Sequence, residues 1–243
     1  MTSKKRWIKA QQHEKLHWQK TANKIIQGKI DQLSWYDWKA QQFETMISKL
    51  NLLPCKDDYT ILEVGSGPIG IVSFVKWGNR YAIEPLEMFF SKNQTLIQLR
   101  NNNVKYLSGQ GEFLPLKNEE FSIVIIDNVI DHTFTPQNVL NEIYRVLKKN
   151  GLMFFTVNIR SVWGTALHSV ITKLHIDKCH PHSFSYKGIR KFLNSFQFSI
   201  LCEEVEDYSE VKKKNCMSNS LKYKLKGYSG LSEILYTAIY QKE

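Results

Sequence analysis

The sequence has no hydrophobic run long enough to cross a membrane. A membrane helix needs about 20 consecutive apolar residues, and no segment of the 243-residue chain approaches that length. The N-terminus, MTSKKRWIKAQQHEKLHWQK, is basic but lacks the apolar stretch of a signal peptide. We therefore expect a cytoplasmic protein with no membrane partner.

Cysteine is scarce, and its spacing excludes the common metal and redox motifs. The four cysteines are Cys55, Cys179, Cys202 and Cys216. No two of them form a CxxC pair, so neither a zinc site nor a redox site is indicated. Four reduced thiols fit a reducing compartment. His180 and His182 stand two apart, but no third ligand follows at metal spacing, and we predict no metal.

Acidic residues are outnumbered, with 33 basic against 23 acidic side chains and a net charge of +10. Such an excess of positive charge is typical of proteins that bind nucleic acid or an anionic surface. The lysines are scattered in short clusters, however, and no appended RNA-binding domain is present. Solvated lysines are the simpler interpretation, which leaves nucleic acid as a less favoured partner.

Strand and helix patterns alternate through the middle of the chain. Strands are expected at 59–64, 80–83, 104–107, 121–126 and 152–157, and helices at 69–77, 86–100 and 135–148. Repeated β-α units of this kind predict a parallel sheet with helices on both faces. Two later strands, 198–205 and 234–240, need not be parallel. They would complete a seven-stranded, mostly parallel α/β sheet.

The two ends of the chain differ from this pattern. Residues 1–52 are polar and helical in character, and their tryptophans recur at helical spacing. We expect an N-terminal helical cap, whose aromatic residues either cover a pocket or simply pack on the main domain. The main domain would span 53–243, with an irregular or helical insertion at 160–183 and a lysine-rich, loop-like insertion at 207–232.

The strongest motif is ILEVGSGPIGIV, residues 61–72. Gly65 and Gly67 lack a Cβ, so the chain can turn sharply and a ligand can approach the backbone. Free N–H groups at the start of the helix expected after them would suit a carboxylate. With Gly70 the motif also fits GxGxxG, and Glu84 ends the next strand, where a carboxylate binds ribose hydroxyls. The loop therefore fits either a dinucleotide or S-adenosylmethionine (SAM).

Glu63 distinguishes these two ligands. An acidic residue just before the glycines, separated from them by Val64, repels a pyrophosphate and suits SAM, whose amino and sulfonium groups are cationic. The residues thus favour SAM over NAD(P), and a tight turn without a ligand is the remaining interpretation.

These segments resemble the class I SAM-dependent methyltransferases, in particular their UbiE-like, small-molecule subgroup. The resemblance rests on EVGSGP, on Glu84-Pro85 and on GQGEFLPLKNEEFSIVIIDNVIDHTFTPQNVLNEIYRVLKKNGLMFFTV. It covers residues 59–157 and, more weakly, the chain to about 196. The resemblance implies a Rossmann-like fold, SAM as the cofactor and methyl transfer as the reaction.

The resemblance also implies a set of cofactor contacts. They are Glu63, Gly65, Ser66 and Gly67 for the methionine moiety, Glu84 for the ribose, Gln110, Gly111 and Glu112 for the adenine, and Asp127 and Asn128 beside the methyl donor. Gln110 stands where the family has a carboxylate, and its side-chain oxygen can still accept a hydrogen bond from the adenine amino group.

Three histidines are candidates for a general base, because an imidazole titrates near neutral pH. His132 follows the fourth strand, and His180 and His182 precede a helix that, by the resemblance, would wall the acceptor pocket. Each also has a structural interpretation: His132 could bond a neighbouring group, and the loop at 180–182 could cap the next helix through Ser183 or Ser185.

The sequence predicts methyl transfer from SAM to an oxygen or nitrogen of a small-molecule acceptor. An RNA or protein methyltransferase is the first alternative. The Asn/Asp-Pro-Pro-Tyr motif of enzymes that methylate amino groups of nucleic acids is absent, since the fourth strand ends in Asp127-Asn128-Val129-Ile130. An NAD(P)-dependent oxidoreductase and a catalytically inactive SAM-fold binding protein are the others.

Overall fold

The computed structural model of the chain describes residues 4–51, 58–174 and 180–243. The strands are β1 Thr60–Val64, β2 Asn79–Glu84, β3 Val104–Ser108, β4 Phe121–Asp127, β5 Leu147–Arg160, β6 Phe184–Ser185, β7 Phe198–Val205 and β8 Glu233–Lys242. The helices are α1 Lys4–Ile26, α2 Gln32–Leu50, α3 Glu87–Phe90, α4 Gln94–Ile97, α5 Pro136–Val146, α6 Val162–Lys173, α7 Tyr186–Leu193, α8 Tyr208–Met217 and α9 Leu221–Ser229, with a 3-10 turn, η2, at Ile71–Ser73. No helix among these residues is long and apolar enough to span a membrane.

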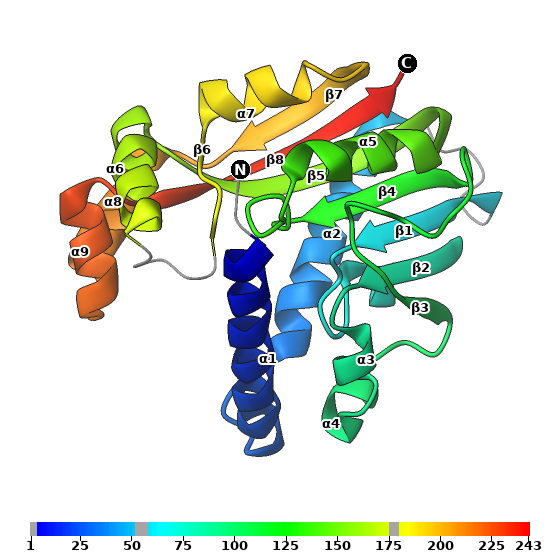
Figure 1. Cartoon of the computed structure of the whole chain (residues 1–243), viewed down its shortest axis with the longest axis horizontal. Helices are drawn as coiled ribbons and strands as arrows, with labels where there is room; N and C mark the ends of the chain where they lie inside the picture. The colour runs from blue at the N-terminus through cyan, green and yellow to red at the C-terminus, as the bar shows by residue number, and fades with distance from the viewer. Residues whose placement is uncertain (1–3, 52–57, 175–179) are drawn as a thin grey trace.

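The strands form one open sheet in the order β3-β2-β1-β4-β5-β8-β7 (Figure 1). Strands β1 to β5 run parallel, whereas β8 pairs antiparallel with both β5 and β7. The predicted seven-stranded, mostly parallel sheet is confirmed, and the short β6 adds a parallel pairing with the end of β5.

Each face of the sheet carries its own hydrophobic core, because side chains along a strand alternate between the faces. Ile61 and Ile123 pack with Phe43 of α2 on one face. Leu62 and Val124 belong to the other core, which α5 and α7 cover (Figure 1). The predicted arrangement of helices on both faces is therefore confirmed.

Two helices expected from the sequence are shorter than predicted. The helix expected at 69–77 is only the turn Ile71–Ser73, which follows Gly70 at a φ of +83°. The helix expected at 86–100 is divided into α3 and α4, because the Asn93 side chain accepts from the N–H of Leu96 and starts a second helix. Apolar spacing alone does not reveal these local hydrogen bonds.

The two predicted insertions lie against each other beyond the end of β5 (Figure 1). The first contains α6. The second, predicted as a loop, is the helix pair α8 and α9. The Trp163 indole donates to the Ser229 carbonyl at 3.3 Å, and Glu233 forms ion pairs with both Arg160 and Lys226. The lysine-rich composition of 207–232 suggested a loop, whereas the segment forms helices that pack on a neighbouring segment.

Candidate active site

A cavity of about 890 Å³ lies at the carboxyl ends of β1, β2 and β4. This is the edge of a parallel sheet where α/β proteins bind ligands. Side chains of α1 and α2 line the opposite wall, so the N-terminal cap forms part of the site. The lining residues of these two helices are Trp7, Ala10, Gln11, Glu14, His17, Trp18, Trp35, Tyr36, Trp38 and Lys39.

The glycine loop after β1 has the conformation that its sequence predicts. Gly65 and Gly67 have φ values of +75° and +60°, in the left-handed region that favours glycine. A Cβ on Gly65 would lie 2.6 Å from the Val129 side chain. A Cβ on Gly67 would meet Tyr36 at 3.5 Å and Trp18 at 3.6 Å. The loop therefore contacts both the β4 loop and the cap, and both glycines together with Ser66 line the cavity.

Glu63 lines the cavity and has a structural partner that the sequence did not reveal. Its carboxylate accepts from the N–H of Val72 at 2.9 Å. Burial raises the pKa of Glu63 to about 8. The expectation of free helix N–H groups beyond the glycines is therefore wrong, because the helix is a single turn and Glu63 occupies one of its donors.

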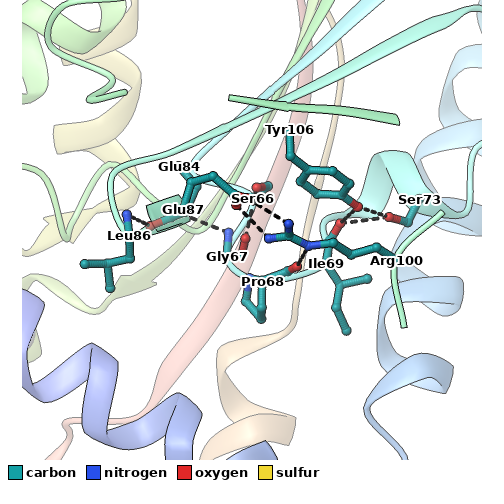
Figure 2. Close-up of polar contacts among 10 residues, drawn as sticks. All are labelled: Ser66, Gly67, Pro68, Ile69, Ser73, Glu84, Leu86, Glu87, Arg100 and Tyr106. Atoms are coloured by element: carbon teal, nitrogen blue, oxygen red, sulfur yellow. Dashed lines mark hydrogen bonds and ion pairs between the residues drawn. The ribbon is translucent and has the colours of Figure 1, made fainter. Parts of the chain in front are cut away.

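Glu84 ends β2, lines the cavity and connects two loops (Figure 2). One carboxylate oxygen accepts from the N–H of Gly67 and the other from the N–H of Leu86, each at 3.0 Å. Burial raises the pKa of Glu84 to about 7, against the lowering effect of these two hydrogen bonds. The carboxylate keeps acceptor capacity for a ligand, since it can receive about four hydrogen bonds.

Arg100 holds the glycine loop through Pro68 (Figure 2) and is not among the residues that line the cavity. Its guanidinium donates to both carboxylate oxygens of Glu87, at 2.8 and 2.6 Å, and to the Pro68 carbonyl at 2.6 Å. The Tyr106 hydroxyl donates to the Ile69 carbonyl at 2.6 Å. None of these supports belongs to a motif, so the sequence alone does not reveal them.

The segment predicted to meet adenine only partly reaches the cavity. Gly111 and Glu112 line it. Glu112 also accepts from the N–H groups of Phe134 and Thr135, at 2.7 and 3.2 Å, and so fixes the start of α5. Gln110 is exposed and is not among the lining residues. The structure therefore does not bring Gln110 to the site.

Asp127 and Asn128 line the cavity where β4 ends. Asp127 accepts from the Thr156 hydroxyl at 2.5 Å and forms an ion pair of 2.9 Å with Lys39. Asn128 has a φ of +53°, and its side chain accepts from the N–H of Asn158 at 3.1 Å. The amide of Asn128 thus fixes the loop, whereas Asp127 binds the cap.

Lys39 is the functional candidate that sequence analysis missed. It is 3% exposed, lines the cavity, and lies 5.5 Å from the ring centres of both Trp35 and Trp38. A signal was present, because Lys39 stands at helical spacing before the buried Phe43 and Ile47 of α2. A lysine on an apolar helix face needs a buried partner, and here that partner is Asp127.

The three candidate histidines differ in their position relative to the cavity. His132 lines the cavity, and its ring centre is 4.5 Å from that of His180. His182 donates from Nε2 to the Thr133 carbonyl at 3.0 Å, and burial lowers its pKa. Neither His180 nor His182 is a lining residue. The structure thus brings only His132 of the three to the cavity.

Comparisons with known proteins agree with this geometry. Residues 62–155 match a family model described as a methyltransferase domain. The chain is 25% identical over 184 residues to thiol S-methyltransferase TMT1B of Rattus norvegicus, covering 71% of this chain and 75% of that protein.

Two solved structures share the fold. One is described as a sarcosine dimethylglycine methyltransferase from Galdieria sulphuraria, with a TM-score of 0.63, 14% identity and coverage of 84% of this chain and 85% of that one. The other is a geranyl diphosphate methyltransferase in complex with SAM, with a TM-score of 0.62, 12% identity and coverage of 84% and 85%.

The family match decides between the two cofactors that the glycine loop alone allowed, and it selects SAM over NAD(P). Residues 62–155 thus form a methyltransferase domain, and the chain is a SAM-dependent methyltransferase.

Proposed function

We propose that this enzyme transfers the methyl group of SAM to an oxygen or nitrogen of a small molecule. The observation that carries the proposal is the cavity, whose volume of about 890 Å³ falls within the range of small-molecule sites. The cap forms one wall of it, so the acceptor must fit between the cap and the carboxyl ends of the strands.

The methionine moiety and ribose of SAM would lie along the glycine loop. We assign the ribose to Glu84 and the methionine end to Glu63, Gly65 and Gly67, since all of these line the cavity. Glu63 would act through its charge, because its carboxylate already holds Val72. The methyl group would then point toward Asp127 and the aromatic wall of the cap.

The acceptor would bind against α1 and α2. The side-chain oxygen of Gln11 is buried without a hydrogen-bond partner among the described residues and lies on a cavity-lining side chain. A buried acceptor atom of this kind calls for a donor from a ligand. Since the sulfonium of SAM is already a good leaving group, positioning the acceptor supplies much of the catalysis. Where the acceptor must lose a proton, His132 is the candidate base.

Methyl transfer from labelled SAM to a panel of acceptors tests the proposal. The panel contains small alcohols, phenols, amines and, because of the rat relative, thiols, with RNA and protein as separate arms. Labelled small-molecule product from an oxygen or nitrogen acceptor supports the proposal. If only thiols are labelled, the acceptor atom is sulfur and not oxygen or nitrogen. If only RNA or protein is labelled, the acceptor is a macromolecule and not a small molecule.

A further inference from the structure

A side-chain cluster beside the cavity is not explained by SAM binding. Asp131, His132 and His180 each offer one ligand atom, and these atoms lie within 4.8 Å of one another. Nε2 of His132 is 3.8 Å from Oδ1 of Asp131. Two imidazoles and a carboxylate are ligands that zinc and other first-row divalent metal ions accept. The sequence concealed this set, because Asp131 and His132 come from a different segment than His180.

The carboxylate of Asp131 gives a second and independent observation. Asp131 is 2% exposed, and its Oδ1 has no hydrogen-bond partner within the described part of the chain. A buried carboxylate oxygen without a partner is costly. This orphaned oxygen is the same atom that faces His132, so a cation between them would satisfy it.

The backbone around the cluster fixes its geometry. The N–H of His182 donates to the Asp131 carbonyl at 3.3 Å, and Nε2 of His182 donates to the Thr133 carbonyl at 3.0 Å. The Thr133 hydroxyl donates to the Ile130 carbonyl at 2.9 Å. His182 is therefore a positioning residue, because it joins the segment of His180 to the turn that carries Asp131 and His132.

We propose that Asp131, His132 and His180 bind one divalent transition-metal ion at the wall of the cavity. His132 lines the cavity, so an acceptor can reach an ion that this ring holds. Three protein ligands leave at least one coordination position open. An oxygen, nitrogen or sulfur of the acceptor that coordinates there loses its proton to solvent water more readily.

The role of the ion in acceptor activation rests on the proposed function, whereas its binding does not. A ring nitrogen that coordinates an ion cannot also accept a proton. With the ion bound, activation of the acceptor would therefore pass from the imidazole of His132 to the metal.

Titration of chelator-treated protein with Co²⁺, without SAM or acceptor, tests the proposal. We expect one ion per chain, with the absorption of nitrogen and oxygen ligands rather than thiolates. Asp131→Asn and His180→Ala should each weaken binding at least about tenfold. His13→Ala is the matched control, because His13 lies on α1 outside both the cluster and the cavity lining, and it should bind Co²⁺ like the wild type.

Circular dichroism and binding of S-adenosylhomocysteine identify variants that are simply misfolded. Asp131→Asn preserves the shape of the side chain and keeps the test valid if His180→Ala does not fold. Failure of the wild type to bind Co²⁺ stoichiometrically, or unchanged binding in a folded variant, would overturn the metal site. Co²⁺ binding with no methyl transfer would instead count against the proposed function alone.

Discussion

Glu63 is the second-last residue of β1 and Glu84 the last residue of β2, and both carboxylates are buried beside backbone N–H groups. Glu63 accepts from Val72, whereas Glu84 accepts from Gly67 and Leu86. Each residue therefore shapes the glycine loop as well as lining the cavity. Each carboxylate thus has two roles, because it can contact a ligand and it also holds the loop. These two roles account for an acidic residue near the end of a buried strand.

Replacing Glu84 by Gln should weaken cofactor binding. The Gln side-chain oxygen can still accept from the N–H of Leu86. The negative charge is lost, however, and the NH₂ group of the amide then lies near the N–H of Gly67. Hydrogen bonds to charged groups contribute about 1.5–3 kcal/mol, so we expect at least about a tenfold loss of affinity for S-adenosylhomocysteine by calorimetry. Glu204→Gln is the control, since Glu204 is exposed and pairs only with exposed Lys49 among the described residues. Equal affinity in both variants would place the ribose elsewhere.

The raised pKa values of these carboxylates predict coupling between protons and cofactor. The pKa of Glu84 is about 7 and that of Glu63 about 8 in the free protein. SAM brings positive charge and hydroxyl donors, which favour the ionised form. Binding should therefore release protons and tighten as the pH rises from about 6 to about 8. Calorimetry in buffers of different ionisation enthalpy measures the release.

The same shifts predict the stability of the free protein. The native state keeps these protons to a higher pH than the unfolded chain, so the free energy of unfolding should fall as the pH rises from about 5 toward 8. Urea unfolding at several pH values should show this fall, and Glu84→Gln should make it shallower. A pH-independent profile, with no proton release on binding, would mean that both carboxylates are ionised before the cofactor arrives.

At the scale of elements, α2 connects the cap to the sheet through two lysines in contrasting surroundings. Lys39 is 3% exposed and pairs with Asp127. Lys49 is 64% exposed and pairs with Glu204. Breaking a buried pair leaves an uncompensated charge and costs about 3–5 kcal/mol, whereas an exposed pair contributes no more than about 1 kcal/mol.

Lys39→Met should therefore destabilise the protein far more than Lys49→Met. Urea unfolding of the two variants measures the difference, and the double variant Lys39→Met/Asp127→Asn should recover part of the loss. If the two single variants are equally stable, water or a neighbouring group already compensates Asp127, and the ion pair is not what attaches the cap to the sheet.

The strands of the fold could be predicted from the sequence, whereas several local elements could not. Central strands such as Phe121–Asp127 are continuous apolar runs, because burial on both faces leaves a plain compositional signal. The 3-10 turn Ile71–Ser73 was missed, since it depends on a hydrogen bond to Glu63. Lys39 was missed for a related reason, since its partner Asp127 lies far away in the sequence. Asp131 was missed because the cluster also needs His180, which comes from a different segment.

At the scale of the whole molecule, the cofactor edge and the lysine-rich helices are separate. The cavity is built by α1, α2 and the carboxyl ends of the strands, whereas α8 and α9 pack beside α6 (Figure 1). Lys212, Lys213 and Lys214 are exposed on α8 and do not line the cavity. These three lysines, which contribute to the net charge of +10, therefore lie outside the cavity.

Binding of RNA, if measured, should reflect this charge and not the active site. We expect weak affinity for a mixed-sequence RNA oligomer that falls steeply with salt, because counterion release dominates non-specific binding. Replacing Lys212, Lys213 and Lys214 by Ser should lower the slope of log affinity against log salt by up to about 3 and leave methyl transfer to a small-molecule acceptor unchanged. Fluorescence anisotropy at several salt concentrations gives the slope, with S-adenosylhomocysteine as competitor. RNA binding that persists at high salt and depends on the cofactor would instead place a nucleic acid at the cavity, and the small-molecule assignment would give way to it.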